Sequence, residues 1–292
     1  MSAPSVNQYH RGLLMLLGGS LADSSSGLFT RLISADAPTM SFWRGIFAFL
    51  AMLCFVAWKY RSRTLQAFLR IGGIGALMIL VLAFGMVANL ASLRLTAVAN
   101  FFMIFATAPF AAAIFGRIFL REPLDAATLV AGAVGFCGIA IMMAGSARSG
   151  GLAGDLLALL VVFLYSTQVT LFRRFPTVDI LPIIAVTTLF SGLIAWPLAH
   201  PGDVAARDLG LLALFGACQL ALGNILIFSA ASRIPAAQAG LLGVMNSAFA
   251  PLWVWLFLRE VPPEATLIGG GIVIAASLAH FAWKWFGPAP DR

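Results

Sequence analysis

The chain has 292 residues, of which 61% are hydrophobic and 10% are charged, and its mean hydropathy is +0.98. Soluble domains have about 25% charged residues, so this composition excludes an ordinary soluble fold and indicates an integral membrane protein. The formal net charge of +7 does not indicate a nucleic-acid partner, because the basic residues stand singly at the ends of apolar runs, as in the loops of membrane proteins.

A membrane-spanning helix needs about 20 mostly apolar residues. The sequence predicts an all-α integral membrane fold with ten such helices. In chain order they cover residues 11–33, 39–59, 71–93, 96–118, 126–144, 154–172, 179–199, 209–231, 235–257 and 265–285. The first run has no signal-peptide cleavage site, so we expect it to remain as a span. The short connections leave no room for a soluble domain, and the function is expected inside the bundle.

The basic residues predict the orientation. If the amino terminus is cytoplasmic, twelve Lys and Arg residues lie on that side and five on the other, while Arg44 lies inside the second span. Cytoplasmic loops carry the excess of Lys and Arg. We therefore expect both termini in the cytoplasm.

The chain contains an internal repeat. An offset of 138 residues superimposes Phe119–Glu122 on Phe257–Glu260, and an offset of 142 superimposes the first span on the sixth and pairs Arg31 with Arg173. The halves, residues 1–150 and 151–292, hold five predicted helices each. Because five is odd, the second half is expected to enter the membrane inverted. Inverted repeats are typical of transporters that work by alternating access.

Polar residues inside the spans are the candidates for function, because they are costly in a membrane unless they are paired or face water. Asp23 lies at the middle of the first span and is interpreted either as a proton or amine site or as a structural carboxylate. Arg44 could reach outward, pair with Asp23, or hold a substrate carboxylate. The neighbouring serines alone are typical of back-bonding to the helix.

The repeat pairs other polar residues across the halves. Asp23 and Ser26 correspond to Tyr165 and Gln168, and Asn100 corresponds to Gln238. Each amide alone is typical of a hydrogen bond between helices, whereas together they predict a cavity at the membrane midplane. The candidate substrate-binding residues are Asp23, Ser26, Arg44, Asn89, Asn100, Tyr165, Gln168, Asn224 and Gln238.

Proline, aromatic and small residues add weaker indications. Pro109 and Pro251 interrupt the fourth and ninth spans, which indicates either gating segments or tolerated kinks. Aromatic residues that could wall a pocket are Phe101, Phe102, Tyr165 and Trp43. Small residues on the fifth and tenth spans predict close helix packing, either between the halves or between two protomers. They are Ala131, Gly132, Gly135, Gly138, Gly269, Gly270, Gly271 and Ala275.

Other chemistry has no support in the sequence. No phosphate-binding loop, zinc-protease motif or nucleophile elbow is present, so we expect no ATP hydrolysis, no enzymatic activity, no cofactor and no metal site. The three cysteines, Cys54, Cys137 and Cys218, lie in apolar runs and are interpreted as packing residues. The expected partners are a small-molecule substrate and the bilayer, and the choice between monomer and homodimer stays open.

Together, these features resemble the drug/metabolite transporter superfamily, specifically its EamA-domain exporters. Arg44, the run Ala108-Pro109-Phe110 and the motif Phe119–Glu122 are similar to that family's pattern, while Pro251 lies four residues later than the repeat would place it. Length and layout resemble YddG-type amino-acid exporters. The resemblance implies a multi-pass protein of the bacterial inner membrane, with a central cavity between the halves and export driven by gradients.

The leading hypothesis is an exporter of small organic metabolites, with amino acids, including aromatic ones, as the best guess. An exporter of cationic drugs or other metabolites is the alternative within transport, with Asp23 as the countercharge. A membrane-embedded enzyme or a receptor-like protein is the alternative from another class.

Overall fold

The computed structural model describes residues 6–231, 247 and 249–286, and every regular element in these residues is helical. The α-helices are α1 (Val6–Ser24), α2 (Ser26–Leu32), α3 (Ala37–Tyr60), α4 (Thr64–Leu69), α5 (Gly72–Leu95), α6 (Val98–Phe105), α7 (Ala108–Leu120), α8 (Ala126–Ser149), α9 (Leu152–Arg174), α10 (Ile180–Ala195), α11 (Ala206–Leu214), α12 (Gly223–Ala231), the helix Phe249–Leu258, and α14 (Glu264–Phe286). Short 3₁₀ turns cover Arg61–Arg63, Trp196–Leu198 and Pro201–Asp203, and a π-helical segment covers Phe215–Leu222.

Eight helices of the described chain are long and apolar enough to cross a membrane. They correspond to the predicted spans two to eight and ten. The first predicted span is divided at Ser25 into α1 and α2. The ninth predicted span is described only in its second part, as the helix Phe249–Leu258.

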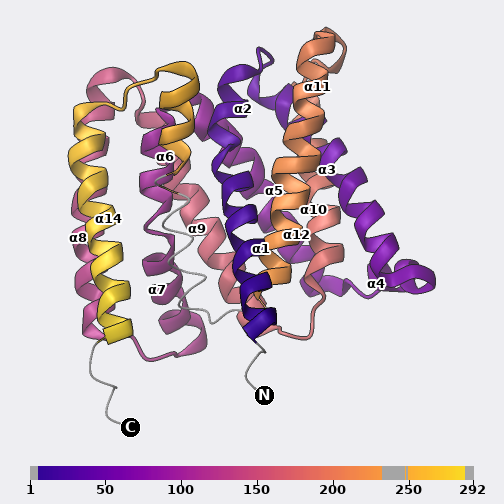
Figure 1. Ribbon diagram of the computed structural model, residues 1–292, viewed down its shortest axis with the longest axis horizontal. Coiled ribbons are helices and arrows are strands. Elements are labelled where there is room, and N and C mark those ends of the chain that lie inside the picture. Colours follow the sequence, from indigo (N-terminus) through magenta and orange to yellow (C-terminus); the bar gives the residue numbers. More distant parts are fainter. Residues whose placement is uncertain (1–5, 232–246, 248, 287–292) are drawn as a thin grey trace.

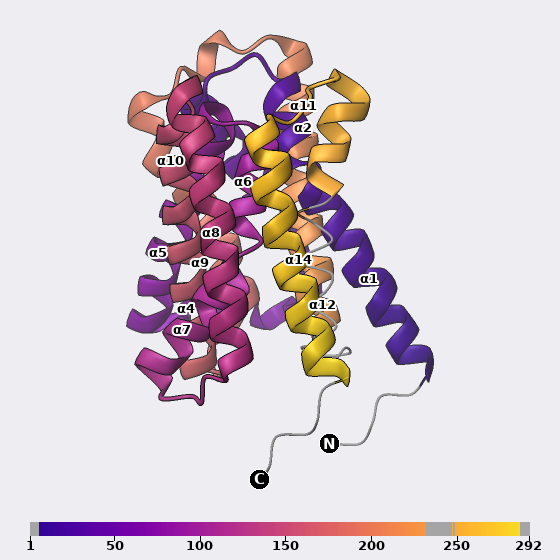
Figure 2. The same ribbon diagram turned by 90° about the vertical axis from the view of Figure 1, so that its left-hand side faces the viewer.

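The long helices stand side by side in one bundle (Figure 1). The helix α8 packs along α14, α3 along α10, α5 along α9, and α1 along α12. A view turned by 90° shows α8 and α14 side by side, facing the viewer (Figure 2). These contacts follow the repeat. The second span packs on its equivalent, the seventh, and the fifth span packs on its equivalent, the tenth. The contact of the first span with the eighth is equivalent to the contact of the sixth span with the third.

Small residues form the two contacts between equivalent spans. A Cβ atom added at Gly138 of α8 would lie 2.5 Å from the carbonyl oxygen of Gly269 in α14. A Cβ atom added at Gly45 of α3 would lie 2.5 Å from the carbonyl oxygen of Thr188 in α10. The predicted small-residue packing between the fifth and tenth spans therefore joins the two halves within one chain.

Helix ends follow from local capping. Asp36 accepts a hydrogen bond from the Thr39 backbone N–H at the start of α3, and Asp125 does the same for Thr128 at the start of α8. Burial raises the pKa of Asp36, but the hydrogen bonds with Thr39 and the nearby His200 lower it more, so it lies below its ordinary value. An ionised carboxylate is the form that a helix N-terminus stabilises.

Three irregularities interrupt the long helices. Besides the break at Ser25, α6 ends at Phe105 and α7 begins at Ala108, directly before Pro109. Proline removes a backbone donor and cannot continue the preceding helix, so this break agrees with the sequence. The π-helical segment Phe215–Leu222 has no such marker in the sequence. The three cysteines are exposed, which corrects their interpretation as packing residues.

Candidate functional site

A cavity of about 500 Å³ lies between the two halves of the bundle. Its described walls come from α1, α2 and α3, from α5, α6 and α7, and from α9, the π-helical segment and α12. Eight of the eleven candidate binding and gating residues line it, namely Asp23, Ser26, Arg44, Asn89, Pro109, Tyr165, Gln168 and Asn224. The predicted cavity is therefore present, and the candidates are brought together from both halves.

The first span places Asp23 in the cavity just before its break. The hydroxyls of Ser24 and Ser25 donate to the carbonyls of Leu21 and Ala22, so these serines bond back to their own helix. Such bonds loosen a helix, which agrees with the end of α1 at Ser24. The break exposes the Asp23 side chain toward the cavity.

A glutamine that the sequence analysis missed contacts Asp23. The Nε2 atom of Gln219 donates to the Asp23 carboxylate at 3.2 Å. Gln219 is only 4% exposed, and its Oε1 atom has no hydrogen-bond partner among the described residues. It lies in the π-helical segment, and such segments are frequent at functional sites. A buried acceptor without a partner calls for a donor, and a ligand in the cavity would supply one once the Gln219 side chain turns toward it.

Arg44 supplies the guanidinium of the cavity. It is 4% exposed, so it does not reach outward to the membrane surface. It donates to the Met86 carbonyl at 3.5 Å, and its guanidinium carbon lies 4.8 Å from the centre of the Phe215 ring. It also interacts electrostatically with Asp23. Asp23 and Arg44 are the charged residues among the described lining.

Aromatic side chains and amides complete the walls. Tyr165 is 40% exposed, and its ring meets Phe105 edge-on with the centres 5.2 Å apart. Phe101 and Phe102 line the cavity as expected. Trp43 is not among the described lining residues, because its indole N–H donates to the Pro201 carbonyl at 3.2 Å outside it.

Asn224 is partly engaged within its own helix. Its Nδ2 atom donates to the Leu220 carbonyl at 2.7 Å, a bond inside the helix rather than the bond between helices that its type suggested. Asn89 lines the cavity from α5. The two amides therefore offer polar positions on two different helices of the cavity wall.

Asn100 lies elsewhere, which corrects its predicted place in the cavity. Its Nδ2 atom donates to Ser146 at 2.6 Å and to Asp155 at 3.3 Å, and its Oδ1 atom accepts from the Thr266 hydroxyl. Asp155 is fully buried and also accepts from Thr96 at 2.5 Å. Asn100 thus joins α6 to α8, α9 and α14. The sequence signal for this cluster was an acidic residue in the first turn of the sixth span.

The remaining candidates are placed in part. Gln238 lies outside the described residues. Pro109 lines the cavity at the start of α7, whereas Pro251 lies in the helix Phe249–Leu258 and is not among the described lining residues. No group of three or more His, Cys, Asp or Glu side chains that could hold a metal occurs in the described part of the chain.

A family model described as "EamA-like transporter family" matches residues 10–144 and again residues 152–281, which is most of the chain. The chain belongs to the EamA-like transporter family. As a member of this family it is a multi-pass membrane transporter of small molecules. The two family matches coincide with the two halves that the internal repeat relates.

A solved structure has a similar fold. A crystal structure described only as "Crystal structure of protein" superimposes with a TM-score of 0.66 at 17% sequence identity, covering 96% of this EamA chain and 100% of that chain. At this identity the likeness concerns the fold alone. None of the curated proteins matches the sequence.

Proposed function

We propose that this EamA protein is a secondary transporter that exports small zwitterionic metabolites, with amino acids, including aromatic ones, as the preferred substrates. One observation carries the proposal. The described cavity lining offers one carboxylate, Asp23, and one guanidinium, Arg44, inside an otherwise mostly apolar and aromatic wall. A site with one charge of each sign and an apolar surface is complementary to an amino acid.

Each part of an amino acid has a partner. The ammonium group would donate to Asp23 and to the free Oε1 atom of Gln219. The carboxylate would bind the Arg44 guanidinium, whose forked donors match two carboxylate oxygens. An apolar or aromatic side chain would lie against Phe105 and Tyr165, whose rings meet edge-on.

We further propose ten spans in two inverted five-helix repeats, residues 1–150 and 151–292. The exchange of helix contacts between the halves supports this arrangement, since the first span meets the eighth as the third meets the sixth. Two inverted halves allow an inward-open and an outward-open state of equal architecture. Transport would then proceed by alternating access around the cavity.

The proposed setting is the bacterial inner membrane. The excess of Lys and Arg on one side supports cytoplasmic termini. No phosphate-binding loop occurs in the sequence, so export would be driven by gradients of substrate or ions.

The substrate class is tested with three related compounds. Purified protein in proteoliposomes is assayed for flux of phenylalanine, phenethylamine and phenylpropionate, which carry both charges, the positive charge alone and the negative charge alone. We expect phenylalanine flux well above that of either analogue and above empty liposomes. Phenylalanine flux no higher than in empty liposomes would remove the amino-acid proposal.

Export of organic cations is the second candidate, because Asp23 and the Gln219 Oε1 atom alone suffice to bind an amine. In that case phenethylamine should be carried at least as fast as phenylalanine. Asp23→Asn should then abolish amine transport and leave neutral substrates largely unaffected, whereas Arg44→Gln should have little effect.

A further inference from the structure

Two Arg–Glu pairs tie the halves of the protein to each other. Arg31 Nε lies 3.0 Å from Glu260 Oε2, and an Arg173 amino nitrogen lies 2.8 Å from Glu122 Oε2. The repeat relates the two arginines by 142 residues and the two glutamates by 138 residues. Each pair joins the first span of one half to the end of the fourth span of the other half. The two ion pairs are therefore equivalent contacts under the internal repeat.

The same local turn presents both glutamates. In each Leu-Arg-Glu motif the helix ends at the leucine, and the arginine adopts a left-handed backbone, with φ of 58° at Arg121 and 55° at Arg259. A left-handed residue after a helix reverses the chain direction. The following glutamate is thereby directed back against the bundle. The repeated motif thus has a structural purpose that its sequence alone did not reveal.

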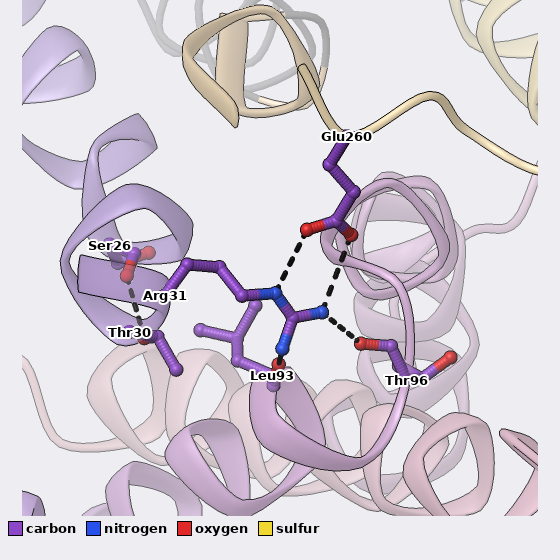
Figure 3. A network of polar contacts seen from close by, with 6 residues as sticks. All are labelled: Ser26, Thr30, Arg31, Leu93, Thr96 and Glu260. Atoms are coloured by element: carbon purple, nitrogen blue, oxygen red, sulfur yellow. Dashed lines mark hydrogen bonds and ion pairs between the residues drawn. The ribbon is translucent and has the colours of Figure 1, made fainter. Parts of the chain in front are cut away.

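The two pairs differ in how firmly they are held. Arg31 donates to both carboxylate oxygens of Glu260 and to the backbone carbonyls of Leu93 and Thr96, as Figure 3 shows. Arg94 adds donations from the end of α5 to the carbonyl of Ile33 at 3.3 Å and to that of Ala35. Charged donors at these carbonyls satisfy helix ends that would otherwise lack partners.

The second pair is looser. Within the described part of the chain, Arg173 donates to a single acceptor residue, Glu122. The side chains of Arg173 and Glu122 are 52% and 38% exposed, against 24% and 32% for Arg31 and Glu260. Exposed pairs of this kind contribute little to stability. The two equivalent contacts are therefore tight at one end of the bundle and loose at the other.

The cavity follows the same asymmetry. The helix α2 lies at one end of the bundle and the far end of α7 at the other (Figure 1). On α9 the lining runs to Phe172, the residue before Arg173. Toward Arg31 the described lining ends at Ser26, and Thr30, one turn further, is fully buried. The cavity thus extends toward the Arg173–Glu122 pair and ends before it reaches the Arg31–Glu260 pair.

We propose that Arg31–Glu260 and Arg173–Glu122 are the two latches of the transport cycle, which rests on the proposed alternating access. Both pairs are formed in the state described. The Arg31–Glu260 latch, with its added bonds to Leu93 and Thr96, holds its end closed in this state, while the exposed Arg173–Glu122 latch becomes buried and gains such bonds in the opposite state. Opening one latch while the other becomes buried exchanges the two halves' roles. Neither pair contacts the substrate, so both act by setting the balance between the two states.

The test uses two cysteine reporters in nanodiscs, where both ends are accessible to a water-soluble maleimide. The three native cysteines are replaced by alanine, and Thr30→Cys and Val169→Cys are introduced separately. Thr30 is buried behind the Arg31 latch, and Val169 lines the cavity toward the Arg173 latch. In this background we expect slow labelling at position 30 and fast labelling at position 169.

Removing one latch should move both reporters in opposite directions. Glu260→Gln should raise the labelling rate at position 30 about tenfold and lower it at position 169, because a charge-assisted network is lost from the closed end. Glu122→Gln and Arg173→Gln should instead keep position 30 protected and raise labelling at position 169. Glu264→Gln is the matched control, an exposed glutamate four residues after Glu260, and should change neither rate.

The outcomes separate the latches from the substrate assignment. Labelling rates in Glu260→Gln equal to those of the background, or shifts in the same direction in Glu260→Gln and Glu122→Gln, would overturn the latches. If Glu260→Gln is not recovered folded, Arg173→Gln decides, because an exposed ion pair contributes little to stability. If phenylalanine moves neither reporter but the variants move both as expected, the latches stand and the amino-acid proposal fails.

Discussion

The helix contacts between equivalent spans and the cavity between the two halves are two different kinds of region. In the former, Gly138 and Gly45 bring backbones so close that a methyl group would clash with a carbonyl oxygen. In the latter, Asp23, Arg44 and Gln219 are held around a space of about 500 Å³. The first kind of region is suited to stay closed, whereas the second holds polar groups that a ligand can reach.

This difference assigns separate tasks to the two regions. Close packing of small residues fixes helices against each other, so α8 with α14 and α3 with α10 are suited to act as fixed joints. The spans that border the cavity are broken at Ser25, broken before Pro109, and π-helical at Phe215–Leu222. We therefore expect substitutions in the cavity to change transport with little change in stability, and substitutions in the joints to do the reverse.

The largest effect is expected in the cavity at Asp23. Asp23→Asn removes the charge that faces the substrate ammonium, and hydrogen bonds to charged groups contribute about 1.5–3 kcal/mol. Phenylalanine flux should fall about 10- to 100-fold. Ser25→Ala, which removes only a hydroxyl bonded back to its own helix, is the control. Full flux in Asp23→Asn would contradict the role of the cavity.

The joint is tested at Gly138. Gly138→Leu forces a side chain into the space now held by the Gly269 carbonyl, and overpacking costs about 1–3 kcal/mol. The unfolding midpoint should fall, as measured by a thermal shift assay in detergent. Gly271→Leu is the control, because Gly271 lies on α14 two residues after Gly269 and a Cβ atom added there meets no atom within 4 Å. If both variants unfold at the same temperature, the joint is not closely packed in the membrane protein.

A smaller effect is expected at Gln219. Gln219→Leu removes one neutral acceptor for the substrate and the donor to Asp23, and a neutral hydrogen bond contributes about 0.5–1.5 kcal/mol. Flux should fall about two- to tenfold. Cys218→Ala, at the adjacent exposed position, should leave it unchanged. Equal flux in the two variants would show that Gln219 only packs in the π-helical segment.

The smallest effect is expected at a position remote from both regions. Asp36→Ala removes the cap of α3, which costs about 1 kcal/mol, and should leave flux unchanged. Because the folded-state pKa of Asp36 is lowered, its stabilisation is present above its unfolded-state pKa and is lost as the pH falls through the folded-state value. The difference in unfolding midpoint between wild type and variant should therefore shrink in acid. A constant difference would contradict the ionised cap.

Hydropathy and the repeat predicted much of this architecture, because both depend on patterns along one chain. Eight spans, the break before Pro109, and eight of the residues that line the cavity follow from them. Pro109 has a chemical reason to end a helix, and a repeat offset pairs residues without knowledge of the fold. The break at Ser25 follows the serines that bond back to their own helix, whereas the π-helical segment carries no comparable marker and depends on packing against other helices.

Asn100 shows why the rest could not be predicted. Successive helix residues point about 100° apart, so the orientation of α6 that directs Phe101 and Phe102 into the cavity turns Asn100 away from it. When a helix is apolar on all sides, hydropathy does not indicate which of its faces points into the cavity. Likewise, Asp155 lies at the start of its span, where a carboxylate is ordinarily interpreted as a loop residue, yet it is fully buried.

The central claim is that substrate crosses through this cavity by alternating access. It is tested most directly by labelling Thr30→Cys and Val169→Cys in the otherwise unchanged cysteine-free protein, with and without saturating phenylalanine. We expect labelling at position 30 to rise while labelling at position 169 falls. Equal changes at both positions, in the same direction, would contradict the account.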